Sequence, residues 1–83
     1  MKKKKVVNLS GKRIKERRTE LGLTQIEVAA SLEVDLNIFL DRSDISEIER
    51  GVRAVKDTEL AAFAKILNIN PLLLIYGNDI PKF

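Results

Sequence analysis

Apolar residues recur along this chain at intervals of three, four and seven positions, the spacing that places side chains on one face of an α-helix. The recurring sets are Ile14 with Leu21; Ile26, Val28, Ala29 and Leu32; Ile45 with Ile48; and Leu60, Ala61, Ala64 and Leu67. No run alternates polar and apolar residues between turns, so no β-sheet is expected. The pattern therefore predicts an all-α fold.

Residues that favour helix ends flank these sets and predict five helices. The candidate N-caps are Ser10, Thr24 (a capping box with Glu27), Asp41 or Ser43, Asp57, and Asn70 followed by Pro71. The candidate left-handed ends are Gly22, Gly51, Asn68 and Gly77. We expect helices over residues 11–21, 25–32, about 44–50 and 58–67, with a short fifth helix after Pro71.

The composition limits the size and the chemistry of the domain. The chain has 83 residues, 45% of them hydrophobic, which suffices for one small core without a metal or a disulfide. It contains neither cysteine nor histidine, so thiolate nucleophiles, zinc-finger ligands and the commonest general base are missing. We therefore expect no enzymatic activity, no metal site and no cofactor.

No apolar run approaches the roughly 20 residues that cross a bilayer. Lys2–Lys5 are followed only by Val6, Val7 and Leu9 before polar residues return, so no secretory signal is expected. Together with the missing cysteines, these features predict a cytoplasmic protein without membrane contact.

Positive charge is concentrated at the start of the chain. Residues 1–18 contain nine Lys and Arg residues and one acid, Glu16, whereas the whole chain has a formal net charge of only +3. Lysines in a flexible arm over residues 1–8 would neutralise DNA phosphates without reading the sequence. A solubilising tail has the same composition, and the sequence does not separate these two roles.

Three segments, in this order, carry a resemblance to a known family. They are Leu21-Gly22-Leu23-Thr24-Gln25, then Ile45-Ser46-Glu47-Ile48-Glu49-Arg50-Gly51, then Leu60 to Asn70 with Ala64-Lys65-Ile66-Leu67. Together they resemble the Cro/repressor-type (XRE-family) helix-turn-helix DNA-binding proteins. The resemblance implies a five-helix domain over residues 9–77, between the arm (1–8) and a C-terminal tail (78–83), whose third helix enters the major groove.

The resemblance also implies candidate DNA contacts. Gln25 matches a position that donates to a phosphate, and Arg53 and Lys56 match positions past the recognition helix that touch the backbone. The candidate base readers are Arg42, Ser43, Asp44 and Glu47. The alternative for the acidic pair is an ordinary solvated face, with Asp44 favoured near the helix start by the dipole.

A second implied feature is architectural. Arg18 and Glu49 match a pair that the family often joins, so we expect a partly buried ion pair that positions the third helix against the first.

The connector between the second and third helices is longer than in tight members of the family, and Glu33 stands where a tight turn needs glycine. The inserted segment, residues 35–41, is too apolar for a solvated loop. We expect Leu36, Phe39 and Leu40 to pack over the core as an extra turn. A protein contact, or a lever that shifts the third helix, is the alternative.

The fifth helix is apolar on all sides, although the family pattern needs only Leu74 and Ile75 inward. An exposed apolar patch would then comprise Leu72, Leu73, Ile80 and Phe83. We predict a C2 homodimer through this patch, and therefore pseudo-palindromic half-sites on DNA.

These observations give one leading hypothesis: a sequence-specific double-stranded DNA-binding transcriptional regulator of bacterial or phage type, acting as a repressor at an operator. The alternative is a protein-interaction module, antitoxin-like or accessory, with weak or no specific DNA binding; the net negative charge outside residues 1–18 favours it. A third class is a basic RNA-binding or nucleoid-coating protein that uses the lysine arm without reading bases. The chain has only three Phe and one Tyr available for stacking, which argues against single-strand binding.

Overall fold

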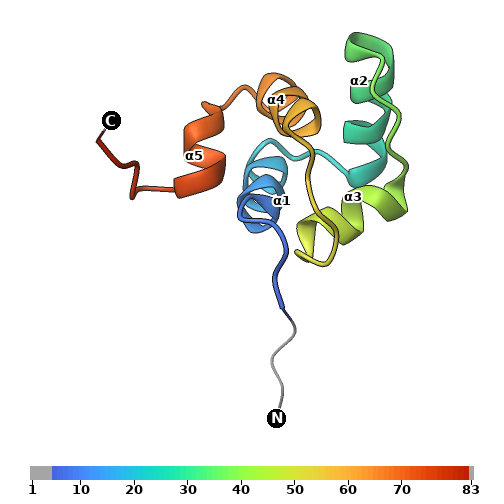
Figure 1. Cartoon of the computed structure of the whole chain (residues 1–83). Helices are drawn as coiled ribbons and strands as arrows, with labels where there is room; N and C mark the ends of the chain where they lie inside the picture. Colours follow the sequence, from blue (N-terminus) through green and yellow to red (C-terminus); the bar gives the residue numbers. More distant parts are fainter. Residues whose placement is uncertain (1–4, 83) are drawn as a thin grey trace.

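A computed structural model of the chain describes residues 5–82, and five helices follow one another in this part (Figure 1). They are α1 (Gly11–Glu20), α2 (Gln25–Leu36), α3 (Arg42–Glu49), α4 (Asp57–Ile66) and α5 (Pro71–Tyr76). No strand occurs between residues 5 and 82, and the predicted all-α fold is confirmed. Lys2–Lys4 of the predicted arm and Phe83 of the predicted patch lie outside the described residues.

One hydrophobic core holds the helices together, with α1 between α3 on one side and α5 on the other (Figure 1). The fully buried side chains come from all five helices and from Leu67, the residue after α4. The largest are Phe63, Ile14, Leu32, Ile45, Ile48, Leu67, Leu74 and Val28. The prediction that Leu21 shares the inward face of Ile14 is wrong: Leu21 is 41% exposed, because α1 ends at Glu20 and the backbone turns there.

Three helix ends share the same left-handed closure. Gly22, Gly51 and Asn68 have positive φ angles, and in each case the amide of the next residue donates to the carbonyl five residues earlier. This Schellman arrangement satisfies carbonyls at the end of a helix that would otherwise lack partners. The sequence predicted all three positions correctly.

The helix starts agree with the prediction only in part. Thr24, Asp41 and Asn70 cap α2, α3 and α5 with their side chains, so α3 begins at Arg42, two residues before the predicted start. Ser10 makes no capping bond; instead the Gly11 amide donates to Asn8 Oδ1 at 2.6 Å.

Asp57 is the first residue of α4 and not its cap. The Lys56 amide donates to the Glu59 carboxylate at 3.0 Å, so this helix start is satisfied from inside its first turn.

The long connector is partly helical. α2 continues to Leu36, one turn past the predicted end, and Asn37 closes it at φ 56°. Leu36 packs against the core and Leu40 is buried, as expected of an extra turn. Phe39 does not follow this prediction: its side chain is 67% exposed.

Candidate nucleic-acid interface

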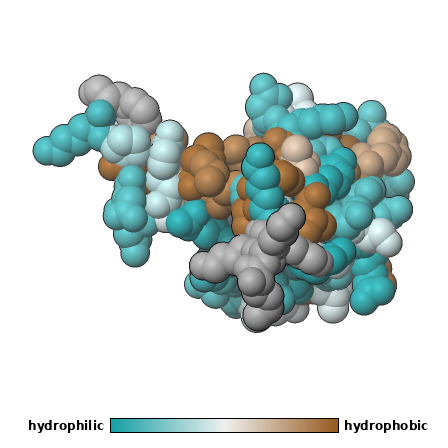
Figure 2. Space-filling model, turned by 60° about the horizontal axis from the view of Figure 1, so that its bottom comes forward, coloured by the Kyte–Doolittle hydropathy of each residue, from teal (hydrophilic) through white to brown (hydrophobic). Residues whose placement is uncertain are grey.

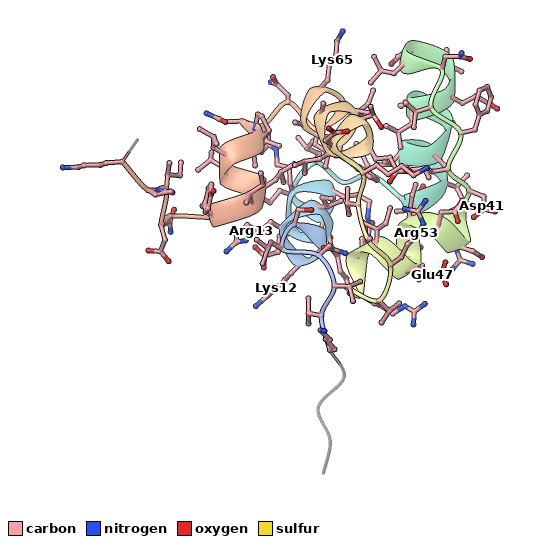
Figure 3. All side chains as sticks on the ribbon, viewed as in Figure 1. Lys12, Arg13, Asp41, Glu47, Arg53 and Lys65 are labelled. Carbon is pink, nitrogen blue, oxygen red and sulfur yellow. The ribbon has the colours of Figure 1, made fainter. Side chains whose placement is uncertain are left out.

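α3 presents one apolar and one polar face, and the polar face is the candidate interface. Ile45 and Ile48 are fully buried, whereas Arg42 and Ser43 are exposed. A shallow surface depression of about 220 Å³ runs along this face, lined by Arg42, Ser43, Ser46, Glu47 and Arg50. Figure 3 shows Asp41, Glu47 and Arg53 on this side of the molecule, far from Lys65 on α4. Arg50 was not among the predicted site residues, although its place just after α3 in the sequence could have suggested it.

Asp44 has a local partner at the start of α3. The Asp44 amide donates to Asp41 Oδ1 at 2.8 Å, and the Asp41 amide donates to Asp44 Oδ2 at 3.0 Å. This reciprocal capping box occupies one oxygen of the Asp44 carboxylate and fixes the first turn. Glu47, one turn later, has no such bond among those of the described residues and is half-buried along the depression.

An ion pair fixes the other end of α3 to α1. Arg18 Nε donates to Glu49 Oε2 at 2.7 Å and Arg18 Nη2 donates to Oε1 at 3.0 Å, while the Glu49 side chain is only 2% exposed. The hydrogen bond that Arg18 donates to Glu49 raises the pKa of Arg18, against the opposing effect of burial. The structure thus contains the pair that the resemblance implied.

Gln25 joins this network from the first turn of α2. Its Nε2 donates to Glu49 Oε1 at 3.0 Å, so the three helices α1, α2 and α3 meet at one carboxylate. Glu49 therefore accepts three hydrogen bonds from side chains, which compensates the burial of its charge.

A second ion pair connects the segment after α3 to α4. Arg53 donates to the two carboxylate oxygens of Glu59 at 3.1 and 3.2 Å. Burial opposes the ionisation of Glu59, but the bonds from Arg53 and from the Lys56 amide outweigh it and lower the pKa of Glu59. The Glu59 bond raises the pKa of Arg53, to which the nearby carboxylates of Asp44 and Glu47 also contribute. The Lys56 side chain is exposed.

The comparisons with known proteins bear on this arrangement. A family model described as helix-turn-helix matches residues 14–74. The chain belongs to the helix-turn-helix family. The match is of the Cro/repressor-type (XRE) kind, and it places the chain among DNA-binding transcriptional regulators. No curated protein and no solved structure gives a match.

In this helix-turn-helix domain, α2 and α3 are the two helices that give the family its name, and they pack directly against each other. The matched range begins at Ile14 and ends at Leu74, two fully buried residues. It contains the Arg18–Glu49 pair and the whole polar face of α3.

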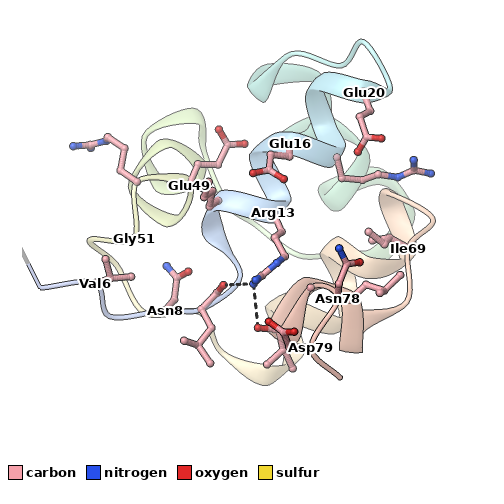
Figure 4. A pocket seen from close by; sticks show the side chains of 17 residues that line it. Val6, Asn8, Arg13, Glu16, Glu20, Glu49, Gly51, Ile69, Asn78 and Asp79 are labelled. Carbon is pink, nitrogen blue, oxygen red and sulfur yellow. Dashed lines mark hydrogen bonds between the residues drawn. The ribbon is translucent and has the colours of Figure 1, made fainter. Parts of the chain in front are cut away.

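Arg13 and Arg17 belong to the basic N-terminal part of the chain, but both donate hydrogen bonds to backbone carbonyls. Arg13 Nη1 donates to the carbonyls of Leu9 and Ile75, each at 3.1 Å (Figure 4), and Arg17 Nε donates to the carbonyl of Leu67 at 2.9 Å. They satisfy carbonyls at the ends of α5 and α4. With Arg18 paired to Glu49, the exposed cations of the described residues up to 18 are Lys5, Lys12 and Lys15.

A groove of about 1020 Å³ lies between α1, α5 and the N-terminal segment (Figure 4). Leu9 and Leu73 lie on it, and both are exposed, as is Ile80 in the C-terminal tail. Figure 2 shows an apolar area on this face of the molecule. Of the predicted patch, Leu73 and Ile80 are exposed and Leu72 is half-buried. Of the two residues expected to face inward, Leu74 is fully buried, whereas Ile75 is half-buried and lines the groove.

No helix within residues 5–82 combines the length and the apolar character that a transmembrane span requires.

Proposed function

We propose that the protein is a sequence-specific double-stranded DNA-binding repressor that places α3 in the major groove of its operator and acts by occupancy. The polar face of α3 carries this proposal: Arg42 and Ser43 are exposed at its first turn, while the opposite face is fully buried and the far end is fixed through Glu49. Because the helix is already held in place, its backbone does not have to be ordered on binding, and only the outer side chains lose conformational entropy.

The candidate residues divide into different roles. Arg42 would donate in a fork to guanine, and Glu47, about one turn later, would accept from the cytosine amino group. The Ser43 hydroxyl would form a hydrogen bond with a base or with a phosphate. Asp44 acts through the capping box, which uses one carboxylate oxygen and leaves the second able to accept a further hydrogen bond.

The phosphate contacts come from the flanks of α3. Gln25 keeps a second Nε2 hydrogen after bonding Glu49, and this hydrogen donates to a phosphate at the positive end of α2. Lys56 contributes as an exposed cation, and Arg53 as a cation already oriented by Glu59. These contacts set the register of the domain on the duplex.

We further propose a C2 homodimer through α5 and the tail, supported by the exposure of Leu73 and Ile80 beside the groove. A two-fold dimer would read two half-sites about one helical turn apart. The protein would then act on DNA in the cytoplasm, at the nucleoid.

The experiment is selection from a random duplex library by the purified chain at about physiological salt. An enriched pseudo-palindrome is the expected result. The Arg42→Ala variant should lose the preference at one position of each half-site, while Lys65→Ala, an exposed cation on α4, should keep the same motif. No enriched sequence from the wild-type chain would contradict the proposal.

A protein-interaction module, antitoxin-like or accessory, is the second candidate, and one surface favours it. Residues 19–41 contain five acids and no Lys or Arg, and they include the exposed side chains of Val34 and Phe39. Such a surface repels DNA and suits a basic partner. The DNA-binding proposal predicts that the logarithm of the binding constant falls linearly with the logarithm of the salt concentration. The interaction module would instead bind duplex DNA weakly or without sequence preference.

A further inference from the structure

Residues 48–53, which end α3 and turn the chain toward α4, form a closing turn that is held by the segment before α1. The Val7 amide donates to the Gly51 carbonyl at 2.9 Å. Asn8 Nδ2 donates to the carbonyls of Ile48 and Arg53 at 3.0 and 2.8 Å. Figure 4 shows Asn8 beside Gly51. Three carbonyls of the closing turn are therefore bound by two consecutive residues that lie some forty positions earlier in the sequence.

The Asn8 side chain also joins the closing turn to α1. Its Oδ1 accepts from the Gly11 amide at 2.6 Å, and the side chain is half-buried. Because an asparagine amide has two hydrogens on Nδ2, each of the two carbonyls can receive one of them. Backbone groups thus use both polar atoms of the side chain, which fixes its orientation and the place of the closing turn relative to α1.

The closing turn carries Arg50, an exposed cation at the border of two surfaces. On one side Arg50 lines the shallow depression along the polar face of α3. On the other side it lines the groove between α1 and α5, whose lining also includes the acids Glu16, Glu20 and Asp79. A guanidinium at this border can turn toward either surface, so the backbone position of Arg50 decides whether the charge is directed to the polar face.

We propose that Asn8 is a positioning residue for DNA binding, which holds the closing turn so that Arg50 donates to a phosphate beside the groove that α3 enters. This inference rests on the proposed DNA-binding function and adds Arg50 to its contacts. Arg53 lies on the same turn, but its guanidinium is already oriented by Glu59. Arg50 is therefore the contact that depends most on Asn8.

A double-mutant cycle on the operator obtained by library selection tests the inference. The wild type, Asn8→Ala, Arg50→Gln and the combination are compared by their affinity for that duplex. Arg50→Gln should weaken binding about tenfold in the wild-type background and about threefold or less with Asn8→Ala. Equal losses in the two backgrounds would overturn the inference, because the contribution of Arg50 would then not depend on Asn8.

Arg42 supplies the matched control, because it lies on the same helix but in the first turn, which the Asp41 capping box fixes. Arg42→Gln should weaken binding to the same extent with and without Asn8→Ala. A coupling of equal size at Arg42 would overturn the inference, since it would show that Asn8→Ala damages the whole helix and not the closing turn.

Hydrogen exchange of the free protein tests the positioning without DNA. The amides of Gly51 and Val52 are bonded to carbonyls in the last turn of α3, whereas the Ile45 amide is bonded in the first turn. With Asn8→Ala the first two amides should exchange about tenfold faster or more, and the Ile45 amide about threefold faster or less. Equal acceleration of all three would indicate a merely global loss of stability and would overturn the inference.

Asn8→Ser replaces Asn8→Ala in both measurements where the alanine variant does not fold. Its hydroxyl oxygen can accept from the Gly11 amide, while its single hydrogen can reach at most one of the two carbonyls. Additive losses on a bound operator would overturn the role of Asn8 alone. Failure of the folded wild-type chain to bind any duplex, even at low salt, would overturn the proposed function and the role of Arg50 with it.

Discussion

Gly11 lies directly against the carbonyl group of Ile48, so the first turn of α1 and the last turn of α3 are in contact through backbone. A β-carbon at position 11 would overlap the Ile48 oxygen and would lie 2.9 Å from Asn8 Oδ1. The close approach needs a residue without a side chain, and its backbone conformation is ordinary helix. Gly11 thus sets the distance between α3 and α1.

Gly11→Ala should therefore destabilise the domain by about 2 kcal/mol or more, because backbone must move to admit the methyl group. The control is Gly22→Ala, where φ is 70° and no other atom lies within 4 Å of the added carbon, so only the conformational cost of about 1 kcal/mol is expected. Urea unfolding measures both. A Gly11→Ala cost no larger than that of Gly22→Ala would contradict the close packing.

The Arg18–Glu49 pair predicts strong coupling between α1 and α3. Either Arg18→Met or Glu49→Met should cost about 3 to 5 kcal/mol, because each leaves a largely buried charge without its partner. The double variant should cost clearly less than the two single costs together. Denaturant unfolding of the four proteins gives the coupling energy, and additive costs would show that the two side chains act independently.

Helix positions were predictable where the signal is local. Thr24 with Glu27, Gly22, Gly51 and Asn68 act within a few residues of their own backbone, and the structure uses each as predicted. The prediction that Ser10 caps α1 was wrong. Asn8 accepts from the first amide of α1 instead, and its side chain is held there by carbonyl groups some forty residues away. A cap that depends on such a long-range contact cannot be predicted from the local sequence.

The contrast between local signals and long-range contacts also explains which features of the candidate site could be predicted. The residues of α3 could be named from the family motif, but their partners could not. Asp44 is committed to the capping box, and Gln25 is bonded to Glu49, a residue of another helix. Arg13 and Arg17 counted as basic surface because charge is visible in a sequence, whereas the carbonyls that bind them appear only when α4 and α5 pack against α1.

Glu59 predicts a pH-dependent contribution to stability. Its pKa is lowered in the folded protein, so its ion pair with Arg53 stabilises the fold fully above the unfolded value of about 4.3, and this stabilisation disappears as the pH falls through the lower folded pKa. Glu59→Gln should cost about 1.5 kcal/mol near pH 7. The difference between the two proteins in urea unfolding should shrink as the pH falls from about 6 to about 3. A difference that stays constant with pH would contradict this role.

The two acids of α3 should respond differently to removal. Asp44→Ala should lower the free energy of unfolding by about 0.5 to 1 kcal/mol, because it removes the bond from the Asp41 amide and keeps the Asp41 side-chain cap, with little change in the selected DNA motif. Glu47→Ala should leave stability nearly unchanged and relax the preference at one base pair by about 1 to 3 kcal/mol. Thermal unfolding and library selection separate these effects. A motif altered by Asp44→Ala as strongly as by Glu47→Ala would assign base contact to both.

The apolar end of the molecule predicts where two copies associate. Leu73 is 36% exposed beside the groove at α5, and Leu73→Asp would bury a carboxylate in a dimer interface formed there, so the dimer should dissociate at micromolar concentration. Phe39→Asp makes the same kind of change on the connector, where the side chain is more exposed, and should leave the dimer intact. Sedimentation velocity of the three proteins measures the outcome. Dissociation by Phe39→Asp alone would move the interface to the connector, and a monomeric wild type would contradict the dimer itself. In the expected case DNA affinity should also fall with Leu73→Asp, because each monomer then binds a half-site without the gain from a linked partner.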